Sequence, residues 1–141
     1  MSDDREAIRA LVNAYATRLD AGDLDGVTAL FEHATFRSAR DGSARTGAEI
    51  RRMYDPVIIY DDGTPRTMHQ ISNLTIDVQG ETARASSYFT VLQVTGQGLH
   101  PILAGEYRDR FACVDGTWHF VERVFDPRLI GDLSRHMRET S

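Results

Sequence analysis

The sequence predicts an α+β fold in which helices near the N-terminus pack on one face of a strongly curved, mainly antiparallel sheet. Before residue 60, apolar residues recur at three- and four-residue steps, which is the spacing of an amphipathic helix. From Arg66 onward, long segments alternate with turn residues, which is typical of successive strands. Helices followed by such a meander cover one sheet face. A bent sheet covered in this way forms a cone-shaped α+β barrel with an open mouth, a natural pocket for a small molecule.

Length and composition fit a single globular domain over residues 1–141. The net charge of −5 provides no basic surface for nucleic acid or an anionic membrane. Cys113 is the single cysteine, and no Cys/His set has the spacing of metal ligands, so we expect neither a metal nor an organic cofactor. The acidic start does not resemble a signal peptide, and no apolar run approaches ~20 residues. We therefore expect a cytoplasmic protein without a membrane span.

Two helices are expected in the first 31 residues. The first carries an apolar stripe that consists of Ile8, Leu11, Val12, Tyr15 and Leu19. Gly22 can take the left-handed conformation that ends a helix, and Asp23 can cap the next one. Ala34–Arg40 could form a short strand. A third helical pattern covers Ala48–Tyr60, where Pro56 predicts a kink or an early end.

Four longer strands follow, separated by glycine-containing turns. They are expected at Arg66–Val78, Glu81–Thr95, Ile102–Val114 and Thr117–Phe125. The last segment, Pro127–Ser141, has apolar residues at helical spacing and is expected to form a closing helix.

Asp20 and His69 are the first candidates for chemistry. Asp20 lies at the edge of the first apolar stripe, where it is either an ordinary surface residue or a charge kept for catalysis. His69 shares a strand face with Ile71 and Asn73, but further along the apolar residues have the other parity, which predicts a bulge near Ser72 and Asn73. His69 alone could be a hydrogen-bonded structural residue. Paired with a carboxylate, it would have a fixed tautomer and one nitrogen free to act as a general base.

Asp109 and Arg123 form a second candidate pair. Asp109 lies among aromatic residues on one strand face, and each residue would be costly to bury without the other. In the last strand Trp118 and Phe120 share a face with Glu122, so neither face is purely apolar. We interpret this mixture as a subunit contact and predict a homo-oligomer, either a dimer or a trimer, formed through the sheet.

Three motifs together resemble the SnoaL-like branch of the nuclear transport factor 2-like superfamily. They are IRALVNAYATRLDAGDLDGVTALF, TMHQISN and AGEYRDRFACVDGTWHFVERVF. Within this branch the chain is similar to scytalone dehydratase, hexachlorocyclohexane dehydrochlorinase and bile acid dehydratase. The resemblance implies a cone-shaped barrel with an Asp–His dyad at Asp20 and His69. It also implies a second polar set at Asp109 and Arg123.

At the position of Tyr15, this chain differs from one of these relatives. The dehydrochlorinase has a lysine five residues before the dyad acid, whereas this chain has Tyr15, as the bile acid dehydratase does. Since a helix turns about 100° per residue, Tyr15 and Asp20 reach one pocket only if that pocket wraps around the helix end. The resemblance implies a cofactor-free lyase or isomerase, dehydratase-like, for a small and largely apolar substrate of the polycyclic or aromatic kind. The alternative is a non-catalytic small-molecule-binding or assembly subunit of the same fold.

Overall fold

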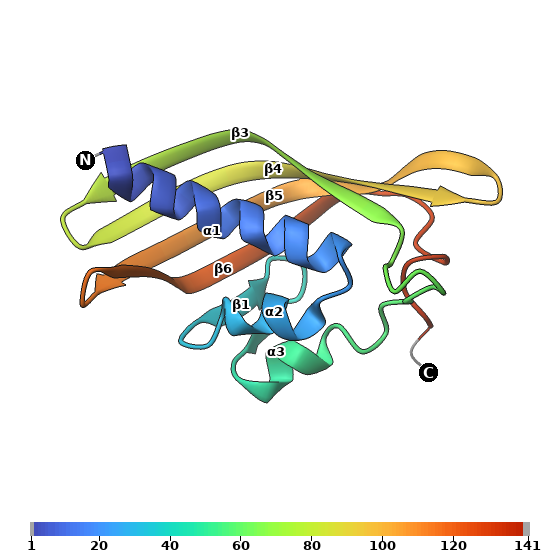
Figure 1. Ribbon diagram of the computed structural model, residues 1–141, viewed down its shortest axis with the longest axis horizontal. Coiled ribbons are helices and arrows are strands. Elements are labelled where there is room, and N and C mark those ends of the chain that lie inside the picture. The colour runs from blue at the N-terminus through green and yellow to red at the C-terminus, as the bar shows by residue number, and fades with distance from the viewer. Residues whose placement is uncertain (1, 140–141) are drawn as a thin grey trace.

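The computed structural model describes residues 2–139, and its longest helix, α1 (Ser2–Asp20), crosses one face of a six-stranded sheet (Figure 1). Of the two short helices, α2 (Leu24–Ala29) packs against α1, and α3 (Ala48–Arg52) packs against α2. Gly22 ends α1 with a φ of +78°, and a Cβ there would approach the Gly63 carbonyl oxygen to 2.1 Å. Asp23 caps α2 by accepting a hydrogen bond from the Gly26 amide at 2.9 Å. Both features follow from the sequence signals at the end of α1.

The sheet has the strand order β2-β1-β6-β5-β4-β3 and is open rather than closed into a full barrel. Strands β3 to β6 form an antiparallel meander, whereas β1 runs parallel to β6. The sheet is therefore mixed but mainly antiparallel, and the predicted α+β class is confirmed. The strands are β1 (Thr35–Ser38), β2 (Ala44–Arg45), β3 (Thr67–Gln79), β4 (Thr82–Thr95), β5 (Gly98–Val114) and β6 (Thr117–Ile130).

The bulge predicted in β3 is present. The register of β3 on β4 shifts between Ser72 and Thr75, and Asn73 has a φ of +53°. Before the bulge His69 is opposite the buried Val91, and beyond it Ile76 is opposite the buried Ala85. The extra residue keeps both parts of the strand facing α1 and the core despite the change of parity.

The prediction of a helix at Pro127–Ser141 is wrong for residues 127–139, which the structure describes. Instead, β6 continues to Ile130, and an irregular segment follows. The strand passes its proline by a register shift on β5, where Gly105 is opposite Pro127. A Cβ on Gly105 would meet the Asp126 carbonyl oxygen at 2.2 Å, so only glycine allows this close approach. Residues 140–141 lie outside the described part of the chain.

The helical pattern at Ala48–Tyr60 is also shorter than expected. Helix α3 ends at Arg52, and Met53 and the residues up to Pro56 form turns instead. Because a proline disfavours the helical conformation of the residue before it, Pro56 prevents the helix from continuing through Asp55.

A second irregularity explains the mixed faces of β6. The register of β5 on β6 shifts between Arg110 and Phe111, so Phe120 and Arg123 are both buried although they have opposite parity. The mixture therefore has a local cause within one chain. Self-association through the sheet stays a prediction. None of the helices within residues 2–139 has the length and apolar character needed to cross a membrane.

Candidate functional site

An inner cavity of about 350 Å³ lies between α1, the sheet and the segment that follows β6. Its wall is mainly aliphatic and aromatic, as is typical of sites for small molecules. Charged side chains, Arg40, Asp41 and Arg45, lie on the exposed surface that borders it. The polar groups in the wall are few, and the ionisable ones apart from these charges are Tyr15, Tyr54, His69, Tyr107 and His136.

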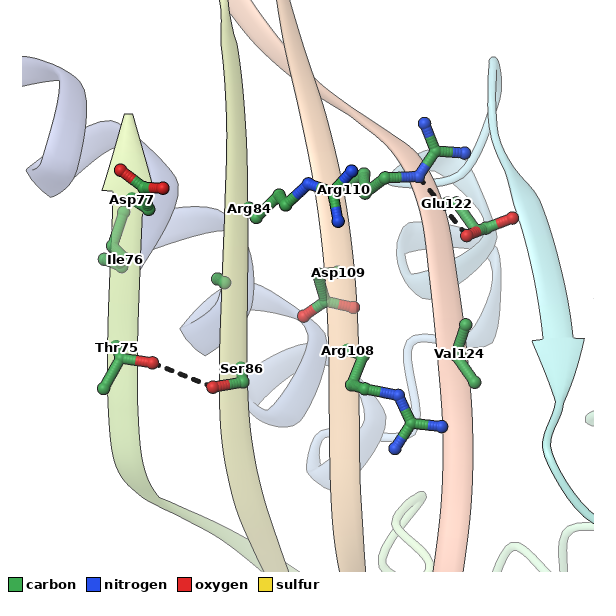
Figure 2. A pocket seen from close by; sticks show the side chains of 11 residues that line it. Thr75, Ile76, Asp77, Arg84, Ser86, Arg108, Asp109, Arg110, Glu122 and Val124 are labelled. Carbon is green, nitrogen blue, oxygen red and sulfur yellow. Dashed lines mark hydrogen bonds and ion pairs between the residues drawn. The ribbon is translucent and has the colours of Figure 1, made fainter. Parts of the chain in front are cut away.

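A larger hollow of about 480 Å³ lies on the other face of the sheet, but it is a shallow and charged surface. Figure 2 shows Arg84, Arg108 and Arg110 on neighbouring strands there, with the helices behind the sheet. Asp109 borders this hollow, yet its side chain is 0% exposed. Of the two, the inner cavity is the better candidate site, because several buried ionisable groups meet a mainly apolar wall there.

The Asp20 carboxylate and the His69 imidazole are in direct contact at the end of α1. Asp20 Oδ1 lies 2.6 Å from His69 Nδ1. Asp20 also accepts hydrogen bonds from the Thr67 hydroxyl at 2.9 Å and from the His69 backbone amide at 2.8 Å. An ionised carboxylate, which only accepts, matches this set of donors. These contacts fix the position of Asp20, and Asp20 in turn orients the imidazole.

This contact leaves Nε2 as the nitrogen of His69 that is free for chemistry. With Nδ1–H donating to Asp20, a neutral imidazole carries its lone pair on Nε2. The His69 ring lines the cavity, and its side chain is 5% exposed, against 20% for Asp20. The acid is thus the outer member of the pair and the imidazole is the inner one.

Tyr15 lies next to His69 and belongs to a group of three tyrosines. The ring centroids of Tyr15 and His69 are 6.4 Å apart, and those of Tyr15 and Tyr107 are 5.7 Å apart. The Tyr15 and Tyr54 hydroxyls are hydrogen-bonded at 2.9 Å. Burial raises the pKa of Tyr15, and it raises the pKa of Tyr54 and Tyr107 further. All three hydroxyls therefore stay protonated near neutral pH and can donate hydrogen bonds.

Asp109 and Arg123 form a fully buried ion pair that does not line the inner cavity. Arg123 Nε and Nη2 donate to the two Asp109 oxygens at 2.8 and 3.0 Å. Burial alone would lower the pKa of Arg123, but the Asp109 carboxylate reverses this and raises it. The guanidinium lies 3.7 Å from the Tyr107 ring centroid and 4.5 Å from that of Tyr15. The pair is therefore behind the aromatic wall and can reach a substrate only through these rings.

Three ionisable residues of the cavity wall, Tyr54, Tyr107 and His136, are absent from the candidates that the sequence yields. Tyr54 follows the apolar pattern of α3 at a four-residue step from Ile50, which marks it as buried but not as part of a site. His136 lies in an irregular segment, where no periodicity exists to indicate its direction. Within residues 2–139 no cluster of three or more His, Cys, Asp or Glu side chains could hold a metal ion.

Comparison with known proteins gives a family and a fold. The family model described as a SnoaL-like domain matches residues 1–124. No curated protein matches the chain significantly. Among solved structures, an NTF2-like protein with a cystatin-like fold from Novosphingobium aromaticivorans is similar, with 22% identity, a TM-score of 0.73, and coverage of 88% of this chain and 81% of that one.

Two further structures from Novosphingobium aromaticivorans are similar over nearly their whole length. A proposed scytalone dehydratase has 24% identity and a TM-score of 0.73, and the match covers 94% of this chain and 91% of that chain. The β subunit of a proposed aromatic-ring-hydroxylating dioxygenase has 19% identity and a TM-score of 0.72, with 92% of each chain covered. At these identities the likeness shows the fold alone.

Proposed function

We infer the function from the premise that the chain belongs to the SnoaL-like family, whose model matches residues 1–124. We propose that it is a cofactor-free lyase or isomerase, dehydratase-like, for a small and largely apolar molecule. One observation carries this proposal: the Asp20–His69 pair, joined at 2.6 Å, presents its imidazole to a mainly apolar cavity. The neighbour named as a proposed scytalone dehydratase makes dehydration the first reaction to test.

In the proposed reaction, His69 is the general base. Its Nε2 takes a proton from the carbon next to a carbonyl group, and the resulting imidazolium is stabilised by Asp20 at 2.6 Å. Proton removal places negative charge on the carbonyl oxygen. For an isomerase, the imidazolium returns the proton to another carbon of the same molecule.

The tyrosine pair is the proposed donor to oxygen. One of the two hydroxyls donates to the other, so one O–H remains available to a substrate oxygen beside His69. In a dehydration, His69 takes the carbon-bound proton, the carbon–oxygen bond breaks, and the hydroxyl leaves as water with a proton from the tyrosine pair. The imidazolium then restores that proton. Arg123 acts as a positioning residue, because its guanidinium lies against the rings of Tyr15 and Tyr107 rather than in the cavity, and Asp109 holds that guanidinium in place.

Hydrogen–deuterium exchange tests the base without knowledge of the natural substrate. A bicyclic ketone such as 1-tetralone is incubated with the protein in D₂O, and loss of the proton next to the carbonyl is followed by NMR. We expect exchange with the wild-type protein and its loss in His69→Gln. The exposed His100, whose ring contacts the Gln97 carbonyl and does not line the inner cavity, provides the matched control His100→Gln. If a folded His69→Gln protein exchanged the proton at the full rate, His69 would not be the general base.

The alternative is an assembly or small-molecule-binding subunit without catalysis. It is favoured by apolar side chains exposed on the outer sheet face, such as Met68 at 59% and Tyr88 at 48%. One structural neighbour is itself named as a subunit of a larger enzyme. If 1-tetralone binds to the wild-type protein but no exchange follows, the non-catalytic subunit replaces the lyase or isomerase as the proposed function. Light scattering at micromolar concentration tests the predicted dimer or trimer, and a monomer would contradict it.

A further inference from the structure

A segment outside the family match completes the cavity. The matched residues end at 124, whereas Leu133, His136 and Met137 all line the inner cavity. Three backbone contacts hold this segment against the loop after α3. The Ile58 amide donates to the His136 carbonyl at 2.8 Å, the Arg138 amide donates to the Pro56 carbonyl at 2.8 Å, and Val57 forms a β-bridge with Met137. His136 is therefore fixed in the cavity wall.

The His136 side chain lacks a hydrogen-bond partner in the part of the chain that the structure describes. The residue is only 7% exposed, and its Nδ1 is shielded from solvent without a partner. A buried polar atom without a partner costs about 1–3 kcal/mol, so such groups usually bind something. Because the ring lines the cavity while Nδ1 is shielded from solvent, Nε2 is the nitrogen that a bound molecule can reach, and such a molecule is its natural partner.

The chemistry of His136 defines what it can bind. Burial lowers the pKa of His136 from 6.5 to about 4; the nearby His69 acts in the same direction and Asp20 opposes it. The ring is therefore neutral near neutral pH, with one nitrogen that donates and one that accepts. A neutral imidazole suits a hydroxyl or carbonyl oxygen rather than a charged group.

We propose that His136 is a specificity-determining residue that binds an oxygen substituent of the substrate. This inference rests on the proposed function, in which the hydroxyl pair of Tyr15 and Tyr54 binds a first oxygen. The substrate is then a cyclic, largely apolar molecule with two oxygen substituents, one for the tyrosine pair and one for His136. The reaction residues lie within the family match, whereas this second contact lies beyond it.

A binding experiment with three related probes tests the role of His136. Naphthalene, 2-naphthol and 2,6-dihydroxynaphthalene have the same ring system with zero, one and two hydroxyls, and their fluorescence reports binding. We expect the wild-type protein to bind the diol most tightly. His136→Phe should weaken diol binding by about 3- to 10-fold, the equivalent of one neutral hydrogen bond, and leave naphthalene within about twofold.

Two variants serve as controls. His136→Gln keeps a donor and an acceptor and should retain diol binding. His33→Phe makes the same replacement at an exposed histidine outside the cavity and should change nothing. Near-UV circular dichroism checks that each variant is folded. If His136→Phe does not fold, His136→Leu replaces it in the comparison with His136→Gln.

Several results would overturn the role of His136. The first is equal loss of all three probes in His136→Phe, which would mean that the residue only packs. The second is unchanged diol binding in that variant, which would mean that the imidazole bonds to water. The third is a wild-type protein that prefers naphthalene to the diol or binds neither. Because this assay follows binding and not turnover, none of these results bears on His69 as a base.

Discussion

Two pairs of an acidic and a basic side chain, Asp109–Arg123 and Asp20–His69, have opposite surroundings in this protein. In the Asp109–Arg123 pair both side chains are 0% exposed, and their charges face each other and aromatic rings. In the Asp20–His69 pair the acid is 20% exposed and the imidazole lines a cavity. The buried pair has no access to a substrate. The comparison teaches that pairing alone does not make a site; one member must also face a space that a molecule can enter.

The largest expected effect is on the Asp20–His69 pair, which borders the cavity. Because a positioned general base contributes roughly 100- to 10,000-fold, His69→Ala should lower the rate of deuterium exchange by at least the smaller of these factors. Asp20→Asn should preserve the shape of the contact but misorient the imidazole, so exchange should also fall. Thermal unfolding of both variants checks that the fold survives. A similar loss of exchange in His119→Ala, outside the cavity, would contradict the comparison.

Arg123→Met tests how much the buried Asp109–Arg123 pair contributes to the free energy of unfolding. Removing the guanidinium leaves Asp109 buried without a partner, which should lower the free energy of unfolding by about 3–5 kcal/mol. Asp109→Leu combined with Arg123→Met should recover most of this loss, since both charges are then gone. Urea unfolding of the single and double variants measures the difference. A stable Arg123→Met protein would show that the pair contributes little to the fold.

The pH dependence of stability extends the comparison to His136. The pKa of His136 is about 4 in the folded protein, and the ordinary value of 6.5 is expected in the unfolded chain. As the pH falls from 6.5 to about 4, the unfolded chain binds a proton that the folded protein does not, so stability decreases. The contribution amounts to at most about 3 kcal/mol. In His136→Phe, the free energy of unfolding, measured by urea unfolding at several pH values, should depend less on pH over this range. An unchanged pH dependence would exclude this contribution.

The smallest effect is expected for the acid on the outer sheet face. Glu122 accepts from Arg37 at 2.6 Å and from Arg110 at 3.4 Å, and both arginine side chains are about half exposed. Glu122→Gln should therefore change the free energy of unfolding by no more than about 1 kcal/mol. Urea unfolding in low and high salt measures it. A loss as large as that of Arg123→Met would remove burial as the distinction between these pairs.

Periodicity predicts this fold well where one face of an element is buried. The stripe in α1 and the change of parity in β3 both correspond to observed features, because burial repeats at the period of each element. Pro127–Ser141 shows the limit. Leu129, Ile130 and Leu133 fit a helical stripe, but pairing with β5 extends β6 to Ile130. Long-range strand pairing has no counterpart in local spacing.

The candidate site was accessible from sequence only in part. Asp20, His69 and Tyr15 belong to motifs shared with relatives, and the structure places them together beside the cavity. The pairing of Asp109 with Arg123 follows from the cost of burying either alone, but their separation from the cavity does not, since it depends on which rings intervene. His136 has no periodic context, so only the course of the backbone reveals its position.

Because of the bulge at Asn73, the insertion or deletion of a single residue in β3 can change which side chains line this pocket. It is one extra residue in β3, and side chains alternate between faces along a strand. Deleting it while β4 keeps its pairing with Ile76 would turn His69 away from the cavity and leave the core beyond the bulge in place. An insertion or deletion of one residue could thus convert a family member with a dyad into one with a pocket alone, without any substitution at Asp20 or His69.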